Sequence, residues 1–419
     1  MVNGSPVHLT LTVQTPLHIG NGITLSREES IVLKKQSANQ PPTFFIYAIN
    51  LQKLLSSIEK LFSEGKTYAD FIDAYSRFLA THDTFSWDTF LKDLVNHSIL
   101  HAPSTNGKSS SDFVLELLKP CFSHCFGIGE EVDHNRMKAS HCFIFDPSDE
   151  KLFPYLPGCS IKGALKNALV WYELTKNSTL RNFFKKEVDQ ILTSSQSNRP
   201  SSATQSDDLT KLILKKIEEK ITYLDIIGRP GFQISDFWVE EQDSSKPILV
   251  IKEYQRLGMK KTSGLGLNSS SSVELSYLAM LMPMVRAHGK ILIPTSCPYT
   301  VTELLDIFKA YSQAVIALNQ ELFPVVTFPQ PTLGLLQLGL GGNYYTKSLG
   351  VLLRTLYPGD QNLFKLRKSF KFGIRRQPHS SSIASLDDSA SKHQFPSTIA
   401  VVKYNSKYVQ SGWVQLSVN

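Results

Sequence analysis

Leu156-Pro-Gly-Cys-Ser-Ile-Lys-Gly-Ala-Leu165 is the stretch of sequence around which the rest of the chain can be interpreted. Its Pro-Gly pair predicts a turn, and Ser160 predicts the N-cap of a helix whose apolar residues recur at helical spacing. The first turn of a helix leaves N–H groups free at the positive end of the helix dipole, and Lys162 and Lys166 share one face of this helix. The stretch therefore predicts a helix start that binds an anion, or else an ordinary capped helix packed on a sheet.

Composition places the chain among globular proteins. Its 419 residues are 42% hydrophobic, which is enough for roughly two to three domains with a core each. Lys and Arg number 44 against 37 Asp and Glu, and the net charge of +7 suits a nucleic-acid partner without requiring one. Five scattered cysteines, an odd number, indicate a reducing, cytoplasmic setting, and neither a secretory leader nor an apolar segment long enough to span a bilayer is evident.

Strand-like and helix-like segments alternate in small groups along the chain. Alternating apolar residues predict strands, and apolar residues at helical spacing predict helices. The predicted strands are 8–15, 30–35, 43–50, 143–145, the last part of 223–239, 248–252, two runs within 273–294 around a turn at His288 and Gly289, 399–404 and 413–418. The predicted helices are one that Asn50 caps, 156–175, 209–221, 303–322 with Thr302 as its cap, and one that ends near 356.

The order of these segments predicts an α+β protein. Two mixed groups of strands and helices favour two domains with a boundary near residue 240, which makes residues 1–240 the N-terminal domain and residues 241–419 the C-terminal one. A helical insertion at about 63–119 belongs to the first domain, and the polar stretch 190–208 has little to bury in a core.

Three glycine-bearing turns are candidate sites for a polyanion, because glycine lets a ligand approach backbone amides closely. The turns lie at residues 20–22, 158–163 and 339–342. Their glycines and the basic or ring side chains beside them include Gly20, Gly22, Gly339, Gly341, Gly342, His18, Lys162 and Lys347. None of the turns matches a nucleotide-triphosphate loop or a dinucleotide fingerprint, so ATP and NAD are not expected and no cofactor is predicted.

The most basic segment is Lys365-Leu-Arg-Lys-Ser-Phe-Lys-Phe-Gly-Ile-Arg-Arg376. It has no acid, and its cations and interleaved rings are Lys365, Arg367, Lys368, Phe370, Lys371, Phe372, Arg375 and Arg376. Cations hold phosphates and rings stack on bases, so the segment predicts an RNA-binding surface, unless it is a solvated loop whose rings face the core. A second, weaker basic stretch consists of Lys252, Arg256, Lys260 and Lys261.

Cysteine and histidine side chains between residues 121 and 142 offer zinc ligands. Their spacing fits no common zinc finger, and the phenylalanines that flank the cysteines are more typical of a core, so no metal site is predicted. The residues are Cys121, His124, Cys125, His134, His141 and Cys142.

Acid–base groups do not form a recognisable catalytic set. His8, His18 and His141 are candidate general bases for a metal-independent ribonuclease, although a lone histidine in a strand or turn is more often structural. Asp225 and Asp236 flank Arg229 without forming a carboxylate dyad. No catalytic residue is therefore predicted.

Five motifs follow one another along nearly the whole chain. They are Thr15-Pro-Leu-His-Ile-Gly-Asn-Gly22, the stretch 156–165, Gly228-Arg-Pro-Gly-Phe-Gln-Ile-Ser-Asp236, the glycine-rich turn 338–347 and Phe395-Pro-Ser-Thr398. In kind, order and spacing they resemble the RAMP superfamily of CRISPR-associated proteins. The resemblance is greatest to the type III-A Csm-complex subunits that cap the 3′ end of crRNA (the Csm subunit five family).

This resemblance implies two ferredoxin-like (RRM-like) domains and a non-catalytic RNA-binding subunit of a ribonucleoprotein, which supports crRNA maturation and antiviral defence. The partners it implies are crRNA, the backbone RAMP and small filament subunits of the Csm complex, target RNA through the complex, and a recruited nuclease. By position it implies RNA contacts at Gly158, Ser160, Lys162, Lys166, Arg229, Gly339, Gly341, Gly342 and Lys347.

Two enzymatic alternatives remain open at this point. One is a RAMP-type endoribonuclease that cleaves CRISPR precursor RNA with His18 or His8 as its base. The other is a backbone RAMP subunit that cuts target RNA through a loop aspartate. The early Pro-Leu-His-Ile-Gly motif and the twofold α+β organisation favour the non-catalytic subunit.

Overall fold

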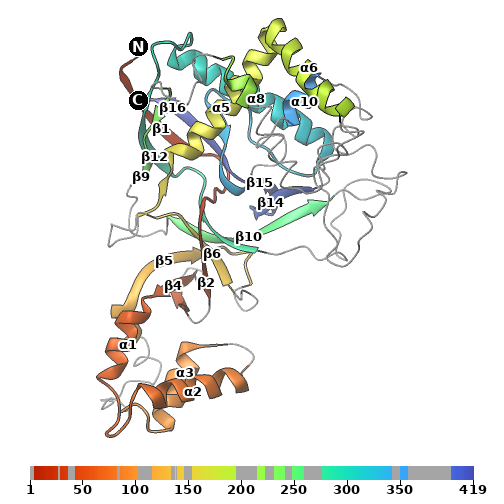
Figure 1. Ribbon diagram of the computed structural model, residues 1–419. Coiled ribbons are helices and arrows are strands. Elements are labelled where there is room, and N and C mark those ends of the chain that lie inside the picture. Colours follow the sequence, from red (N-terminus) through yellow and green to blue (C-terminus); the bar gives the residue numbers. More distant parts are fainter. Residues whose placement is uncertain are drawn as a thin grey trace.

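The computed structural model describes residues 4–26, 29–35, 43–82, 85–101, 116–133, 137, 139–145, 153–194, 215–221, 231–240, 248–258, 276–341, 350–356 and 398–419. Within these residues the chain is an α+β protein, as its sequence predicts. It has two sheets, a group of helices beside the first sheet, and a helical insertion that projects from the second (Figure 1). None of the described helices has both the length and the apolar character that crossing a membrane requires.

The first sheet has seven strands in the order β13-β16-β1-β12-β9-β7, with β8 paired to β12. These strands are β1 (Pro6–Val13), β7 (Tyr155–Leu156), β8 (Gln233–Ile234), β9 (Phe237–Val239), β12 (Arg286–Leu292), β13 (Leu335–Gln337) and β16 (Trp413–Val418). In β1 the alternation of Val7, Leu9 and Leu11 with polar residues buries one face of the strand and leaves the other face partly exposed.

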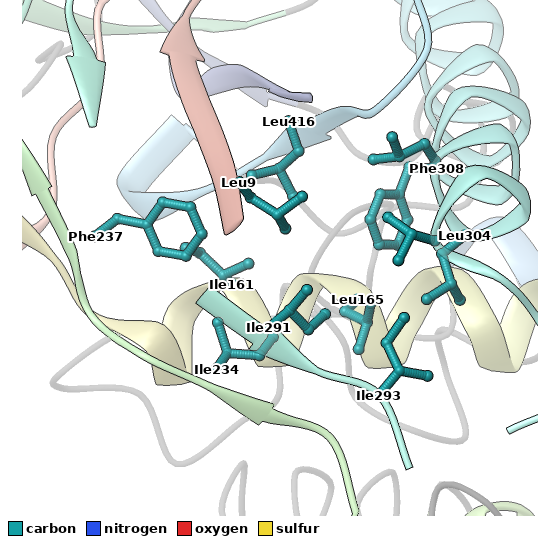
Figure 2. A pocket seen from close by; sticks show the side chains of 12 residues that line it. Leu9, Ile161, Leu165, Ile234, Phe237, Ile291, Ile293, Leu304, Phe308 and Leu416 are labelled. Atoms are coloured by element: carbon teal, nitrogen blue, oxygen red, sulfur yellow. The ribbon is translucent and has the colours of Figure 1, made fainter. Parts of the chain in front are cut away.

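Four helices gather on one side of the first sheet (Figure 1). They are α5 (Gly158–Lys176), α6 (Ser178–Ser194), α8 (Val301–Leu322) and α10 (Gly350–Leu356). Leu9 of β1, Leu165 of α5 and Phe308 of α8 point toward one another in the core that α5 and α8 form with the sheet (Figure 2). The space enclosed there is about 10 Å³, near the smallest volume that holds one water molecule, so this is a packed core and not a ligand site.

The second sheet has nine strands, in the order β2-β6-β11-β10-β5-β4-β3, and β14 pairs with both β10 and β15. The strands are β2 (Gly20–Ser26), β3 (Ser30–Lys35), β4 (Thr43–Ile49), β5 (Phe122–Ile128), β6 (Ala139–Phe143), β10 (Leu249–Gly258), β11 (Ser276–Leu281), β14 (Thr398–Tyr404) and β15 (Lys407–Gln410). β10 is the central strand, because it pairs with β11 along one edge and with β5 and β14 along the other.

The strand pairing crosses residue 240 in both sheets. In the first sheet β1 pairs with β12 and β16, and in the second β5 pairs with β10. A division into residues 1–240 and 241–419 is therefore not visible in the strand order, and a domain boundary near residue 240 stays a prediction.

Of the connections that carry the chain between the two sheets, three are joined side by side by hydrogen bonds at or next to their ends. They are residues 14–19 between β1 and β2, 282–285 between β11 and β12, and 411–412 between β15 and β16. We call these three connections the seam. Leu17 and Leu281 exchange both backbone hydrogen bonds, at 2.9 and 2.8 Å, and the N–H of Gly412 donates to the carbonyl of Pro16 at 2.9 Å.

The turn between β11 and β12 lies earlier than its predicted position. It contains Met284, whose φ is 74°, whereas the predicted turn at His288 and Gly289 lies inside β12. Gly289 is required within the strand because a Cβ there would lie 2.4 Å from Cδ2 of Phe237. A glycine that serves close packing is thus mistaken for a turn when only the sequence is considered.

Two helices for which a cap is predicted do begin with a side-chain cap. In one of them the capping residue differs from the predicted one. Asn50 Oδ1 accepts the N–H of Lys53, which confirms the predicted cap of the first helix. The cap of α8 is Thr300 and not Thr302: the Thr300 hydroxyl accepts the N–H of Glu303, and the Glu303 carboxylate accepts the N–H of Thr300. This reciprocal capping box starts the helix at Val301, two residues before the predicted start.

The helical insertion has a hydrophobic core of its own. It consists of α1 (Leu51–Glu59), α2 (Tyr68–Thr81), α3 (Trp87–Asn96) and the short 3₁₀ helix η1 (Lys119–Cys121). The insertion starts earlier than the predicted residue 63, because α1 contributes buried side chains to this core. At its centre the ring of Phe90 lies between 5.2 and 5.7 Å from the rings of Phe71, Tyr75, Phe78 and Phe85.

We predict that Phe90→Ala unfolds the insertion and leaves the two sheets folded. The Phe90 side chain is fully buried in the insertion's own core, and truncating such a ring costs about 3–5 kcal/mol. Hydrogen exchange should accelerate in α1, α2 and α3 and remain slow in β1 and β12. The control Leu79→Ala alters an exposed side chain of α2 and should leave exchange unchanged. Faster exchange in β1 and β12 of Phe90→Ala would show that the insertion is not independent.

Candidate nucleic-acid interface

The start of α5 is held against the first sheet by a carboxylate of the chain itself. The N–H of Gly158 donates to Oδ1 of Asp236 at 2.8 Å, and Asp236 lies in the turn between β8 and β9. The N-cap is Pro157, so the predicted cap at Ser160 is wrong: Ser160 lies inside the first turn, and its N–H donates to the carbonyl of Pro157 at 3.0 Å. An anion that binds here must therefore use groups other than the Gly158 N–H.

The two glycines of α5 have opposite surroundings. A Cβ at Gly158 would lie 2.2 Å from the carbonyl oxygen of Ile234 and 2.6 Å from that of Ser235. A Cβ at Gly163 would meet nothing within 4 Å. Gly158 is therefore buried to let the helix meet the β8–β9 backbone, and it is not exposed to a ligand.

The accessible groups of this helix start are Cys159, which is exposed, and Ser160 and Lys162, which are partly exposed. Lys166, one turn further along, forms an ion pair in which its Nζ lies 2.9 Å from Oε1 of Glu218. The charge of Lys166 is thus partly engaged within the protein. Lys162 is the better placed of the two cations to meet a phosphate near the helix start.

The first glycine turn is divided between the interior and the surface. The His18 side chain is only 4% exposed, and its Nδ1 lies 2.8 Å from the carbonyl oxygen of Ala279. Burial lowers the pKa of His18, so the ring is neutral at pH 7 and donates its Nδ1–H to that carbonyl. Gly20 and Gly22 are exposed, and Gly22 has a φ of +84° with open space around it. The buried ring therefore positions the turn, and the exposed residues 20–22 are the part of it that can touch a ligand.

The third glycine turn packs against the first one. It forms the 3₁₀ helix η2 (Gly339–Gly341). Gly339 has a φ of +67°, and a Cβ there would lie 2.1 Å from the carbonyl oxygen of His18. A Cβ at Gly341 would lie 1.9 Å from the carbonyl oxygen of Ser411. The predicted RNA contacts at Gly339 and Gly341 thus fall on glycines that pack the chain against its own backbone.

Amide side chains complete this junction. Gln337 Nε2 donates to the carbonyls of Gly341 and Ser411 at 3.0 Å each, and Trp413 Nε1 donates to Oε1 of Gln410 at 3.1 Å. The sequence does not reveal these residues, because an isolated Gln in a strand has no distinguishing spacing. For Asp236 a signal exists, since an acid after a short strand can cap a helix, but which helix it caps depends on the tertiary fold.

The structure brings together two of the three glycine turns. Residues 20–22 follow the seam directly and η2 packs against it, whereas α5 starts beside β8 and β9. The other predicted contacts, namely Arg229, Gly342, Lys347 and the basic segment 365–376, lie outside the described residues. In the second basic stretch, Lys252 is buried with its Nζ 2.8 Å from Oε2 of Glu131, so it is not a surface cation.

The cysteine ligands considered for zinc lie on separate elements. Cys125 is on β5 and Cys142 on β6, with β10 and β11 between these strands, and Cys121 belongs to the core of the insertion. Over the described ranges, no group of three or more His, Cys, Asp or Glu side chains is arranged to hold a metal ion.

No hydrogen bond joins any two of the described histidines that were considered as general bases, although His141 lies near enough to His18 to help lower the pKa of His18. His8 is exposed on β1 of the first sheet, and His141 is exposed on β6 of the second, where its Nδ1 lies 3.1 Å from the hydroxyl of Thr24. His18 is the buried ring described above. The geometry does not pair any two of them for acid–base work.

Comparisons with known proteins relate this fold to others. A sequence model of the RAMP superfamily matches residues 10–277. The chain is also similar to a chain of a cryo-EM structure of a Csm–crRNA–target RNA ternary complex in a type III-A CRISPR-Cas system, with a TM-score of 0.52 and 14% identity over 98% of this chain and 100% of that one. A crystal structure of T. onnurineus Csm5 matches with a TM-score of 0.46 and 14% identity over 84% and 95% of the two chains. No curated protein matches.

We predict opposite effects for alanine at the two glycines of α5. Gly158→Ala would force the β8–β9 backbone away from the helix and should lower the melting temperature. Gly163→Ala should instead raise stability by about 0.5–1 kcal/mol, because alanine has less backbone freedom to lose in a helix. Thermal unfolding followed by circular dichroism measures both changes. A Gly158→Ala protein as stable as Gly163→Ala would mean that Gly158 is not a packing contact.

We predict that His18 makes stability depend on pH below its ordinary pKa of 6.5. The folded-state pKa is lowered, so the unfolded chain binds more protons, and the stabilisation is complete above 6.5 and is lost as pH falls through the folded pKa. Urea unfolding at about pH 7.5 and about pH 5.5 measures this loss. His18→Asn keeps a donor for Ala279 without a titrating ring and should lose less. Equal losses in the two proteins would assign the pH dependence to other groups.

Proposed function

Because this chain belongs to the RAMP superfamily, we propose that it is a non-catalytic crRNA-binding subunit of a type III-A CRISPR Csm effector complex, located in the cytoplasm at the 3′ region of the crRNA. Its fold is similar over its whole length to a chain of a complex that contains crRNA and target RNA. Its proposed partners are crRNA, the backbone RAMP and small filament subunits, target RNA reached through the complex, and a recruited maturation nuclease.

The observation that carries this proposal is the accessible first turn of α5. Cys159, Ser160 and Lys162 are open to solvent at a helix start, where a hydroxyl, a cation and the positive end of the helix dipole can together hold a phosphate. Asp236 keeps the Gly158 N–H engaged, so Lys162 supplies the positive charge that the phosphate needs. Phosphate contacts of this kind do not distinguish bases, which suits a subunit that must accept guides of any sequence.

Other parts of the chain extend the same RNA contact in this proposal. Gly20 and Gly22 are exposed at the start of β2, where a phosphate can approach the backbone closely. The basic segment 365–376 adds six cations, and Arg229 and Lys347 add one each. In this proposal these groups add sequence-tolerant contacts to a phosphate chain.

The endoribonuclease alternative is weakened by the burial of His18. Its ring is only 4% exposed, so Nε2, the ring nitrogen left to accept a proton, has no free path to a 2′-hydroxyl. No observation favours the alternative that cuts target RNA through a loop aspartate.

We predict that changing Lys162 and Lys166 together to alanine alters the guide RNA of the complex. Two cations fewer on the RNA path weaken phosphate binding and reduce the slope of log affinity against log salt by about 1–2. The protein is expressed with its operon neighbours, the complex is isolated, and the bound RNA is sequenced and quantified. Guides should show altered 3′ ends or lower occupancy in this variant.

Lys176→Ala is the matched control, because Lys176 lies at the other end of α5. Its guides should equal those of the unaltered complex in length and amount. A stable complex whose guides are the same with and without this protein would rule out the 3′ capping role. Cleavage of precursor RNA by the pure chain in the presence of a chelator would favour the endoribonuclease instead.

A further inference from the structure

The face of the first sheet that lies opposite α5 and α8 carries a row of side chains that the proposed function does not use. The strand register places these residues side by side across five strands: Tyr155 on β7, Trp238 on β9, His288 on β12, Thr10 on β1 and Ser417 on β16. Directly paired residues point to the same face of a sheet. Figure 1 shows α5, α6, α8 and α10 gathered on the other side of this sheet.

Trp238 is the large ring exposed in this row. Its side chain is 44% exposed, although Phe237 and Val239 on either side of it are buried in the helix-covered core. The centroid of its ring lies 5.4 Å from that of Tyr155, with the two planes 32° apart. Rings that lie on an open sheet offer π faces on which nucleic-acid bases stack.

Two cations lie on the same face. Arg286 and Lys290 are exposed, and each is two residues from His288 along β12, so the period of the strand points all three side chains to one side. Within the described part of the chain, no ion pair engages the side chain of either cation.

His288 contacts the carboxylate of Glu240, an acidic side chain near these cations. Its Nδ1 lies 3.1 Å from the hydroxyl of Thr10, and its Nε2 contacts the carboxylate of Glu240. The Glu240 carboxylate thus contacts the His288 ring and, among the described residues, forms no ion pair with Arg286 or Lys290.

We propose that this face, defined by Tyr155, Trp238, Arg286, His288 and Lys290, is a stacking platform for single-stranded RNA. A base lies against Trp238, and the adjoining phosphates meet Arg286 and Lys290. RNA fits this face better than an apolar protein surface, which would leave the two cations without partners.

The stacking platform adjoins the start of α5. Tyr155 precedes Gly158 by three residues, and Asp236, which holds Gly158, precedes Trp238 by two. One RNA strand can therefore pass from Lys162 over the sheet edge at β7 to Trp238. The inference rests on the proposed function, because it adds base contacts to the RNA whose phosphates the α5 start would hold.

Tryptophan fluorescence of the full chain tests this directly. Of the four tryptophans, Trp87 and Trp413 are buried, Trp171 is half-buried, and Trp238 is 44% exposed. The emission of Trp238 is isolated by subtracting the spectrum of Trp238→Phe. The probes are short single-stranded oligomers of uridine and of adenosine, with polyglutamate as an acidic protein-like competitor, and iodide as a quencher of accessible indole.

The expected result is saturable quenching of Trp238 by RNA and its protection from iodide. Trp238→Leu, which keeps an apolar side chain but removes the ring, should bind RNA at least about fivefold more weakly. Trp238→Phe should stay within about twofold of the unaltered chain, because a ring remains for stacking. Lys290→Gln should weaken binding, whereas Lys403→Gln, which removes an exposed strand lysine of the second sheet, should not.

Two results would overturn the platform while leaving the proposed function intact. One is RNA binding that leaves Trp238 open to iodide and is equally tight in Trp238→Leu. The other is protection of Trp238 by polyglutamate and not by RNA, which would make this face a protein-docking surface. Failure of RNA to bind any form of the chain, alone or in the complex, would instead overturn the proposed function and the platform with it.

Discussion

The hydrogen bonds of the seam are the constraint on which the rest of the structure depends. The two sheets share no strand, and the seam is where backbone hydrogen bonds fix one relative to the other. Leu17 pairs with Leu281, and the hydroxyl of Thr15 accepts the backbone N–H of Trp413 at 3.0 Å. Buried backbone groups must be paired, so none of these crossings can shift without breaking the others. The first crossing lies in the motif Thr15-Pro-Leu-His-Ile-Gly-Asn-Gly22.

Packing at the seam also explains residues that would otherwise be assigned to ligand binding. His18 is neutral because it is buried, and its ring is spent on the Ala279 carbonyl. Gly339 faces the His18 carbonyl so closely that no side chain fits there. His18 and Gly339 are thus explained by packing within the chain, without any contact to RNA. The start of α5 differs, because its first glycine packs and the groups after it are open to solvent.

Local patterns predict the helices of this chain well, because an apolar stripe at helical spacing, such as Leu304, Phe308 and Tyr311 in α8, has few alternatives to burial on one face. The same patterns do not predict which strands pair. β1 lies between β12 and β16, which are hundreds of residues away in sequence, and no local signal encodes those partners. The candidate site shows the same difference between local and tertiary signals. The sequence alone predicts Lys162, because this residue lies at a helix start. It does not predict the role of Asp236, because that role exists only where the β8–β9 turn meets α5.

Asp236 determines how this chain can hold a phosphate chain at all. A carboxylate at the first N–H of α5 offsets part of the positive end of the helix dipole, so the helix start alone is a weak anion site. The core beneath it is closed, with a space of about 10 Å³, so no deep pocket supplements it there. In the proposed function, affinity for RNA would therefore be the sum of modest contacts spread over the surface, each a lysine, an exposed glycine or a ring. Such a sum suits an extended strand better than a compact ligand, and it makes binding strongly dependent on salt.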